Sequence, residues 1–153
     1  MANKVSKLLQ QAIEALAIQD VYLKSCQAKC VDDFDPKYTG FEELLVQQMH
    51  VVHRSELVDI DGDGQLARIY IRFGTRWVNP NEDGYTDIKA FVEADFIAEY
   101  QVTNKLEQAA IDEFALKNVS YHAWPYWREF LSSQCERLRL PRVILPTVQF
   151  NKQ

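Results

Sequence analysis

The sequence has little glycine, few cysteines and no long apolar run. Among its 153 residues are 5 Gly and 3 Cys, and no stretch approaches the roughly 18 apolar residues of a membrane-spanning helix. It contains no G-x-G-x-x-G or P-loop pattern, which excludes the common backbone cradles for nucleotide phosphates. An odd number of cysteines argues against a disulfide framework and indicates reduced thiols in the cytoplasm.

Basic residues are also scarce. Lys and Arg number 17 against 22 Asp and Glu, which gives a net charge of −5. Because binding to nucleic acid requires clustered cations, nucleic acid is not an expected partner. Charged residues interrupt the start of the chain, at Lys4, Lys7 and Glu14, so we expect neither a secretory signal nor membrane insertion. A content of 47% apolar residues suffices for a folded core.

The first apolar pattern is helical. Val5, Leu9 and Ala12 belong to a stripe with the spacing of one helix face. The stripe predicts an N-terminal amphipathic helix within residues 1–17, over about residues 4–17, and either Asn3 or Ser6 could cap it.

Over residues 18–102 the apolar period becomes two, which is typical of strands. The second strand is expected at about residues 41–58. The clearest alternation, over residues 88–100, has a polar face that only Phe91 and Ile97 interrupt. Short turns between the strands predict a four-stranded antiparallel meander.

The helical period returns over residues 104–140. Asn104 and Glu107 resemble a capping box that opens a first helix. Pro125 suits the first position of a second helix, which ends at Pro141. Residues 141–153 are expected to form an extended apolar tail. Strands followed by helices predict one α+β domain over residues 1–153, a four-stranded antiparallel sheet packed with C-terminal helices plus the N-terminal helix.

The acidic turn at residues 59–64 resembles the opening of a calcium loop. Its sequence is Asp59-x-Asp61-x-Asp63-Gly64, but the twelfth position, which requires a bidentate acidic residue, is Tyr70. A hairpin turn is therefore expected there.

The other candidate clusters also lack the required geometry. His50 and His53 are three residues apart on a strand and point to opposite faces, while Cys26 and Cys30 are separated by about 13 Å. No motif positions Cys135 for nucleophilic catalysis. We therefore expect no bound metal, no cofactor and no enzymatic activity.

The second strand is apolar on both faces. Phe41, Leu45, Met49 and Val51 lie on one face, and Leu44, Val46 and Val52 lie on the other. One small sheet with two or three helices cannot easily bury both sets. The surplus predicts burial in a core, subunit contacts or a groove for an extended apolar peptide, and the sequence does not choose among these.

The C-terminal segment resembles the SecB chaperone family. Residues 123–130 read Ala-Trp-Pro-Tyr-Trp-Arg-Glu-Phe, and Leu140-Pro141 and the apolar residues 145–148 follow. The family has a Phe/Trp-Pro-Tyr-x-Arg-Glu helix start, a Phe/Leu-Pro pair and an apolar tail. Residues 18–24 are similar to its first strand. The resemblance covers most of residues 18–150, and its specific part is the Pro-Tyr-x-Arg-Glu segment.

The resemblance implies an ATP-independent holdase that binds unfolded or partly folded polypeptides in apolar grooves. It also implies a homotetramer built as a dimer of dimers. Apolar strand residues and the aromatic helix start are then the expected client-binding residues: Phe41, Leu45, Met49, Val51, Trp124, Tyr126 and Trp127.

Two departures from secretion-type members concern the partners. Those members carry acidic residues that contact the translocase motor SecA where this sequence has Ser25 and Lys29, which argues against coupling to SecA. The Trp-Pro-Tyr spelling and the additional N-terminal helix are closer to SecB-like chaperones of toxin–antitoxin systems. The expected clients are therefore presecretory proteins or an antitoxin. The alternative is a non-chaperone oligomeric structural or adaptor protein whose apolar surface is used up in subunit contacts.

Overall fold

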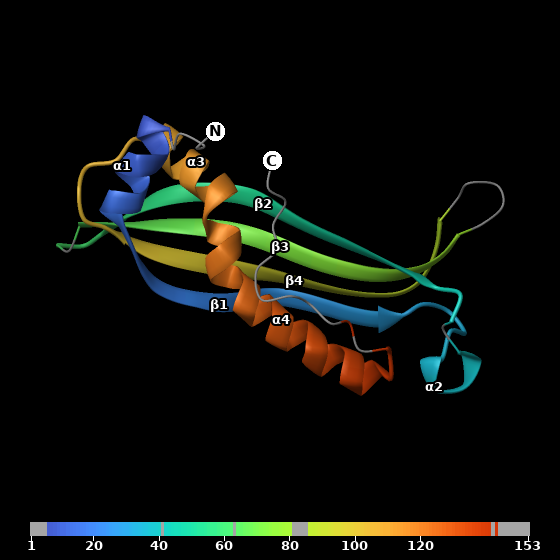
Figure 1. Ribbon diagram of the computed structural model, residues 1–153. Coiled ribbons are helices and arrows are strands. Elements are labelled where there is room, and N and C mark those ends of the chain that lie inside the picture. Colours follow the sequence, from blue (N-terminus) through green and yellow to red (C-terminus); the bar gives the residue numbers. More distant parts are fainter. Residues whose placement is uncertain (1–5, 41, 63, 81–85, 142, 144–153) are drawn as a thin grey trace.

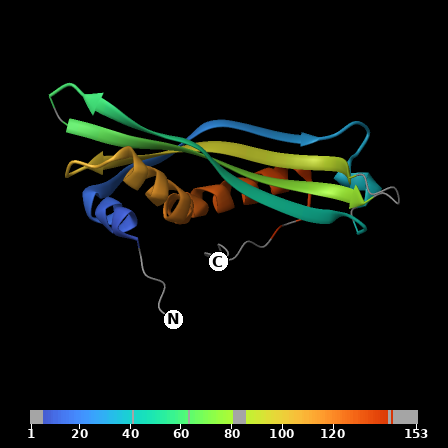
Figure 2. The same cartoon turned by 90° about the horizontal axis from the view of Figure 1, so that it is seen from above.

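Four long strands form one antiparallel sheet, and helices cover one of its faces (Figures 1 and 2). The computed structural model describes residues 6–40, 42–62, 64–80, 86–141 and 143. In chain order the elements are α1 (Lys7–Ala15), β1 (Leu16–Cys30), α2 (Pro36–Thr39), β2 (Leu45–Ile60), β3 (Gly64–Pro80), β4 (Thr86–Val102), α3 (Gln108–Lys117) and α4 (Val119–Leu138).

The strand order in the sheet is β1-β4-β3-β2. Strands β2 to β4 form the predicted meander, but including β1 in it was wrong, since β1 pairs with β4 and places Val21 opposite Ala98. Residues 31–44 connect β1 to β2 and are long enough to carry the chain past the end of the sheet. The predicted α+β fold, with its four-stranded antiparallel sheet and its helices at both ends of the chain, is confirmed.

Alternation along the central strands separates two faces. On β3, Ile69, Ile71 and Phe73 are fully buried under the helices, on what we call the inner face. Arg68 and Arg72 point to the opposite, outer face, which no helix covers in Figure 2. The predicted period of two is therefore confirmed on β3.

The centre of the core is a group of aromatic rings between α4 and β3. Trp127 stacks on Phe73 with 5.7 Å between ring centroids and 10° between ring planes. Trp124 meets the same phenylalanine edge-on at 5.9 Å, and Phe96 of β4 does so at 6.2 Å. These contacts fix α4 diagonally across the inner face (Figure 1).

The helix boundaries differ from the predictions in two places. α4 begins at Val119, so Pro125 lies inside the helix rather than at its start. The extra turns are stabilised because Val119 and Ala123 are fully buried, which offsets the backbone hydrogen bond that proline cannot donate.

The capping box predicted at Asn104 was also wrong. α3 begins at Gln108 after Glu107, whose side chain caps no backbone N–H. The preceding residues are held outside the helix, because the backbone N–H of Thr103 donates to the carbonyl of Ala15 at 2.7 Å.

At the other end of the chain, Ser6 is the cap of α1. Its Oγ accepts a hydrogen bond from the backbone N–H of Leu9 at 3.1 Å. The buried residues of this helix are Ala12 and Ala15, and the helix packs against α3.

Trp127 is expected to contribute most to the stability of the α4 contact. We predict that Trp127→Ala lowers the free energy of unfolding by about 3–5 kcal/mol, because a buried ring is replaced by a cavity. The neighbouring Tyr126 is 47% exposed, so Tyr126→Ala should change stability by less than about 1 kcal/mol. Urea denaturation of the two variants measures the difference. Equal losses would contradict the assignment of Trp127 to the core.

His122 makes folding sensitive to mild acid. Its Nδ1 lies 2.7 Å from the Tyr100 hydroxyl, and burial lowers its pKa below the usual 6.5. The unfolded chain therefore takes up this proton at a higher pH than the folded chain does. The contribution of His122 to the free energy of unfolding is therefore fully present above about pH 6.5 and is lost as the pH falls below that value.

We predict that His122→Gln reduces the decrease in stability between about pH 7 and pH 5, measured by urea denaturation at each pH. Burial also lowers the pKa of His50, so the double variant with His50→Gln should show a still smaller decrease. An unchanged pH dependence in the double variant would contradict this account.

Candidate functional site

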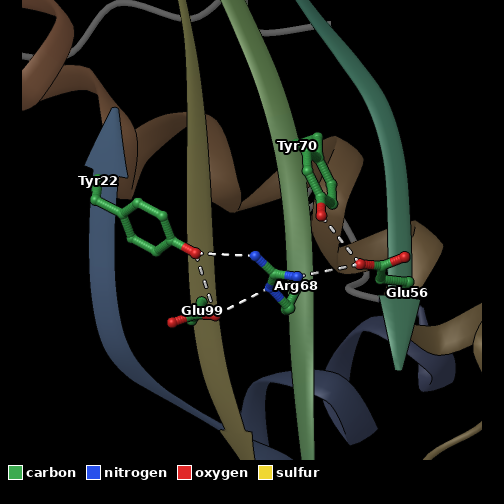
Figure 3. Close-up of polar contacts among 5 residues, drawn as sticks. All are labelled: Tyr22, Glu56, Arg68, Tyr70 and Glu99. Carbon is green, nitrogen blue, oxygen red and sulfur yellow. Dashed lines mark hydrogen bonds and ion pairs between the residues drawn. The ribbon is translucent and has the colours of Figure 1, made fainter. Parts of the chain in front are cut away.

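On one half of the outer face, polar contacts connect side chains of all four strands (Figure 3). The Arg68 guanidinium on β3 donates to Glu99 of β4 at 3.0 Å and to the Tyr22 hydroxyl of β1 at 2.9 Å. It also lies 3.6 Å from Glu56 of β2, which accepts a hydrogen bond from Tyr70 at 3.1 Å. Both carboxylates are thus paired with the same cation.

A second ionic group lies next to this network on the same face. Arg72 donates two hydrogen bonds to Asp95, at 2.7 and 3.0 Å. Ser25 donates to the same carboxylate at 3.1 Å. These bonds, the Arg72 bonds foremost, hold the pKa of Asp95 below its ordinary value. Each of the three carboxylates in the two groups thus has an arginine partner.

The other half of the outer face carries exposed apolar side chains along β2. Leu45, Met49 and Val51 are 54%, 42% and 45% exposed, although each is a large apolar side chain. They lie opposite Val78, Gly74 and Arg72 of β3. β2 is an edge strand of the sheet, so this apolar row borders solvent at a strand edge.

A hollow of about 750 Å³ lies beside this row. Side chains from all four strands contribute to its lining, among them Gln27, Met49, Arg76, Phe91 and Glu93. We call it the Gly74 hollow, because Gly74 is the residue of the central strand β3 in its lining that has no side chain.

The Met49 side chain lies over Gly74. A Cβ atom at position 74 would be 3.0 Å from the Met49 Cε and 3.2 Å from its Cγ. The thioether thus occupies the place of the missing side chain. Since methionine is flexible and polarisable, it can shift to admit another apolar group. The floor of the hollow is therefore deformable.

The chemistry available here is burial rather than bond making. The hollow joins apolar groups of Met49, Ile88 and Phe91 to amide and charged groups at the sides. This combination suits an apolar side chain whose neighbouring backbone and polar groups stay near water. In the described part of the chain, no three His, Cys, Asp or Glu side chains are grouped to hold a metal ion.

The structure separates the predicted client-binding residues. Leu45, Met49 and Val51 share the outer face, as the alternation predicted. Trp124 and Trp127 are 6% and 1% exposed in the core behind the sheet. They do not join the strand residues, because their rings fill the space between α4 and Phe73.

Two further predicted residues lie apart from this group. Tyr126 is exposed on α4, in the layer on the other side of the sheet. Phe41 lies outside the described residues, as do residues 144–153 of the predicted tail.

Several residues of the hollow were not predicted as site residues, and the sequence held a signal for two of them. Gly74 interrupts the alternating arginines of β3, and an isolated glycine in a strand often marks a close approach. Phe91 interrupts an otherwise polar face of β4. No feature of the neighbouring sequence indicated that Gln27 or Glu93 lines the hollow, because strand pairing brings these two residues there.

The histidine pair and the acidic turn singled out in the sequence can be placed in the structure. His50 packs against Phe73 on the inner face, whereas His53 lies 3.8 Å from Asp95 of the outer face. The segment that resembles a calcium loop connects β2 to β3, and Asp63 within it lies outside the described residues. None of the helices in the described residues is long and apolar enough to span a membrane.

Comparison with solved structures finds a match over nearly the whole chain. The Mycobacterium tuberculosis SecB-like chaperone, in complex with a ChAD peptide from the HigA1 antitoxin, aligns with a TM-score of 0.72 and 16% identity, over 95% of this chain and 99% of that one. A Streptococcus agalactiae protein of unknown function aligns at a TM-score of 0.37 and 10% identity, over 86% and 96%, which is too low to carry an argument. No family model and no curated protein matches the sequence. The comparison confirms the architecture that the C-terminal motif implied: this chain has the SecB-like fold.

Proposed function

We propose that this protein is an ATP-independent holdase that binds unfolded or partly folded polypeptides on the apolar half of its outer face. The observation that carries the proposal is the exposed row of Leu45, Met49 and Val51 beside the Gly74 hollow. Large apolar side chains gathered on one surface mark an interaction site in a folded protein.

The energetics suit reversible holding. Burial of one large apolar client side chain contributes about 1.5–3 kcal/mol. Several such contacts are needed for useful affinity, and each is weak enough to be released without ATP. Met49 can adapt its shape to different client side chains, which favours broad rather than single-sequence recognition.

Edge strand β2 supports binding of an extended client. It is 16 residues long and pairs only with β3 among the described strands. Its other edge offers backbone N–H and C=O groups to a client strand, in the manner of β-strand addition. Apolar client side chains would then reach the outer face beside Met49.

An antitoxin is the favoured client class. A neighbour with the same fold was solved with an antitoxin peptide bound. At the two positions where secretion-type relatives carry acidic residues, Ser25 hydrogen-bonds to Asp95 and Lys29 is a cation on the outer face, opposite Phe91. The absence of acidic side chains there does not favour SecA, so presecretory clients are the second choice.

The proposal includes a cytoplasmic homotetramer without catalytic activity. Exposed apolar residues of the helix layer suit subunit contacts, on the side of the sheet away from the Gly74 hollow; these are Leu116, Tyr121 and Tyr126. If both layers served only such contacts, the protein would instead be a structural or adaptor oligomer.

Suppression of aggregation separates the two functions. We predict that the protein at a stoichiometric ratio, without ATP, keeps a chemically unfolded model protein in solution. The Leu45→Asp/Met49→Asp variant should need at least about threefold more protein for the same effect, because carboxylates resist burial beside client side chains. Light scattering at 360 nm measures this.

Ile60→Asp is the matched control. Ile60 is also an exposed apolar residue of β2, 36% exposed at the far end of the strand, and its substitution should leave the suppression unchanged. A folded oligomer that fails to suppress aggregation at severalfold excess would overturn the holdase proposal in favour of the structural one. Equal loss in both variants would overturn the assignment of the site.

A further inference from the structure

We infer that the Gly74 hollow selects extended segments in which a bulky apolar side chain has a carboxylate two residues away. The inference deepens the proposed function, on which it rests, by naming the class of client sequence that the site prefers. The inference rests on the order of the side chains across the four strands of the outer face.

Two neighbouring rows cross the sheet at the hollow. The register places Gln27, Glu93, Gly74 and Met49 side by side in the first row. The second row consists of Lys29, Phe91, Arg76 and Gln47. The first row contains the glycine, over which the Met49 and Glu93 side chains lie. The second row contains two cations, one on each side of a phenylalanine.

The spacing of these rows matches that of an extended peptide. Gly74 and Arg76 are two residues apart on β3, which separates the rows by about 6.8 Å. Side chains at positions i and i+2 of a client strand have the same separation and face the same way. A client that lies on the outer face along β3, rather than beside the β2 edge, and places an apolar side chain over Gly74 therefore places its next sheet-facing residue over the cations.

The cations of the second row have no ionic partner among the described residues. Arg76 donates to the neutral amide oxygen of Gln47 at 2.6 Å. Neither Arg76 nor Lys29 forms an ion pair in the described part of the chain. By contrast, Arg68 and Arg72 elsewhere on the face are already paired with carboxylates.

Glu93 is the one acidic residue in these two rows, and it belongs to the first. In the row on its other side, the hydrogen bonds and charge of Asp95 raise the pKa of the Arg72 guanidinium, and the charge of Glu93 adds a smaller contribution. The second row thus keeps a positive excess that a client carboxylate can complement. A client lysine at the same place would face two cations and be disfavoured.

Three fluorescein-labelled peptides test this selectivity. Each has one Trp at its centre and six residues on either side of it. The residues at −2 and +2 from the Trp are both Asp, both Ser or both Lys, and the others are Gly and Ser. Identical flanks make the result independent of the direction in which the peptide lies. Fluorescence anisotropy gives the Kd of each peptide for the full-length protein.

The Asp peptide should bind about two- to fivefold more tightly than the Ser peptide, as expected for exposed ion pairs, and the Lys peptide more weakly than the Ser peptide. Arg76→Glu should bring the Lys peptide ahead of the Asp peptide. The control Arg54→Glu should keep the original order, because Arg54 lies 4.1 Å over the Tyr70 ring at the polar half of the face.

Gly74→Leu tests the hollow itself. The backbone of Gly74 needs no left-handed conformation, so leucine is compatible with the strand. Circular dichroism of the variant checks that it is folded. The leucine side chain displaces Met49 and fills the space, so all three peptides should lose at least about fivefold in affinity. Unchanged affinities would show that the Trp binds elsewhere and would overturn the inference.

The failures of the two proposals are distinguishable. If the protein suppresses aggregation but binds the three peptides equally, or binds none of them, the charge selectivity is overturned and the holdase proposal stands. If it neither suppresses aggregation nor binds any of the peptides, the holdase proposal falls as well, and the selectivity falls with it.

Discussion

Packing of α4 against the inner face of the sheet is the contact on which the rest of the structure depends. Trp127 and Trp124 enclose Phe73 from one side, and the small β4 residues Ala94 and Ala98 are fully or almost fully buried on that face. One layer of helices can cover only one face of a sheet. The opposite face must therefore remain stable in contact with solvent or with a partner.

The two halves of that outer face meet this requirement differently. Arg68 and Arg72 link neighbouring strands through paired carboxylates, so the polar half is stable in water. Along β2 near Met49 no such pairing exists among the described residues, and large apolar groups stay exposed beside the Gly74 hollow. The outer face thus combines a half held by ion pairs with a half that carries exposed apolar side chains along β2 beside a deformable hollow.

The periodicity of apolar residues predicted those features of the fold that depend on residues close together in the chain, such as the face of the sheet on which a side chain lies. The period of two in β3 placed Ile69 and Arg68 on opposite faces, and the row of Leu45, Met49 and Val51 followed from the same rule. The pairing of β1 with β4 could not be predicted in this way, since it depends on the path of the long connection between β1 and β2. Likewise, Pro125 marks a helix start only when burial upstream does not extend the helix, and here Val119 extends it. The aromatic residues near Pro125 looked equally suited to a groove and to a core, and tertiary packing alone assigned Trp127 to the core.

The most direct test of the central claim uses the two methionines of the chain, Met1 and Met49. Protein labelled with ¹³C at the methionine methyl group gives one NMR signal from each, and the Met49→Leu variant assigns them. On addition of an unfolded client that the protein keeps soluble, the Met49 signal should shift or broaden. An unchanged Met49 signal with the client bound would contradict binding on the outer face.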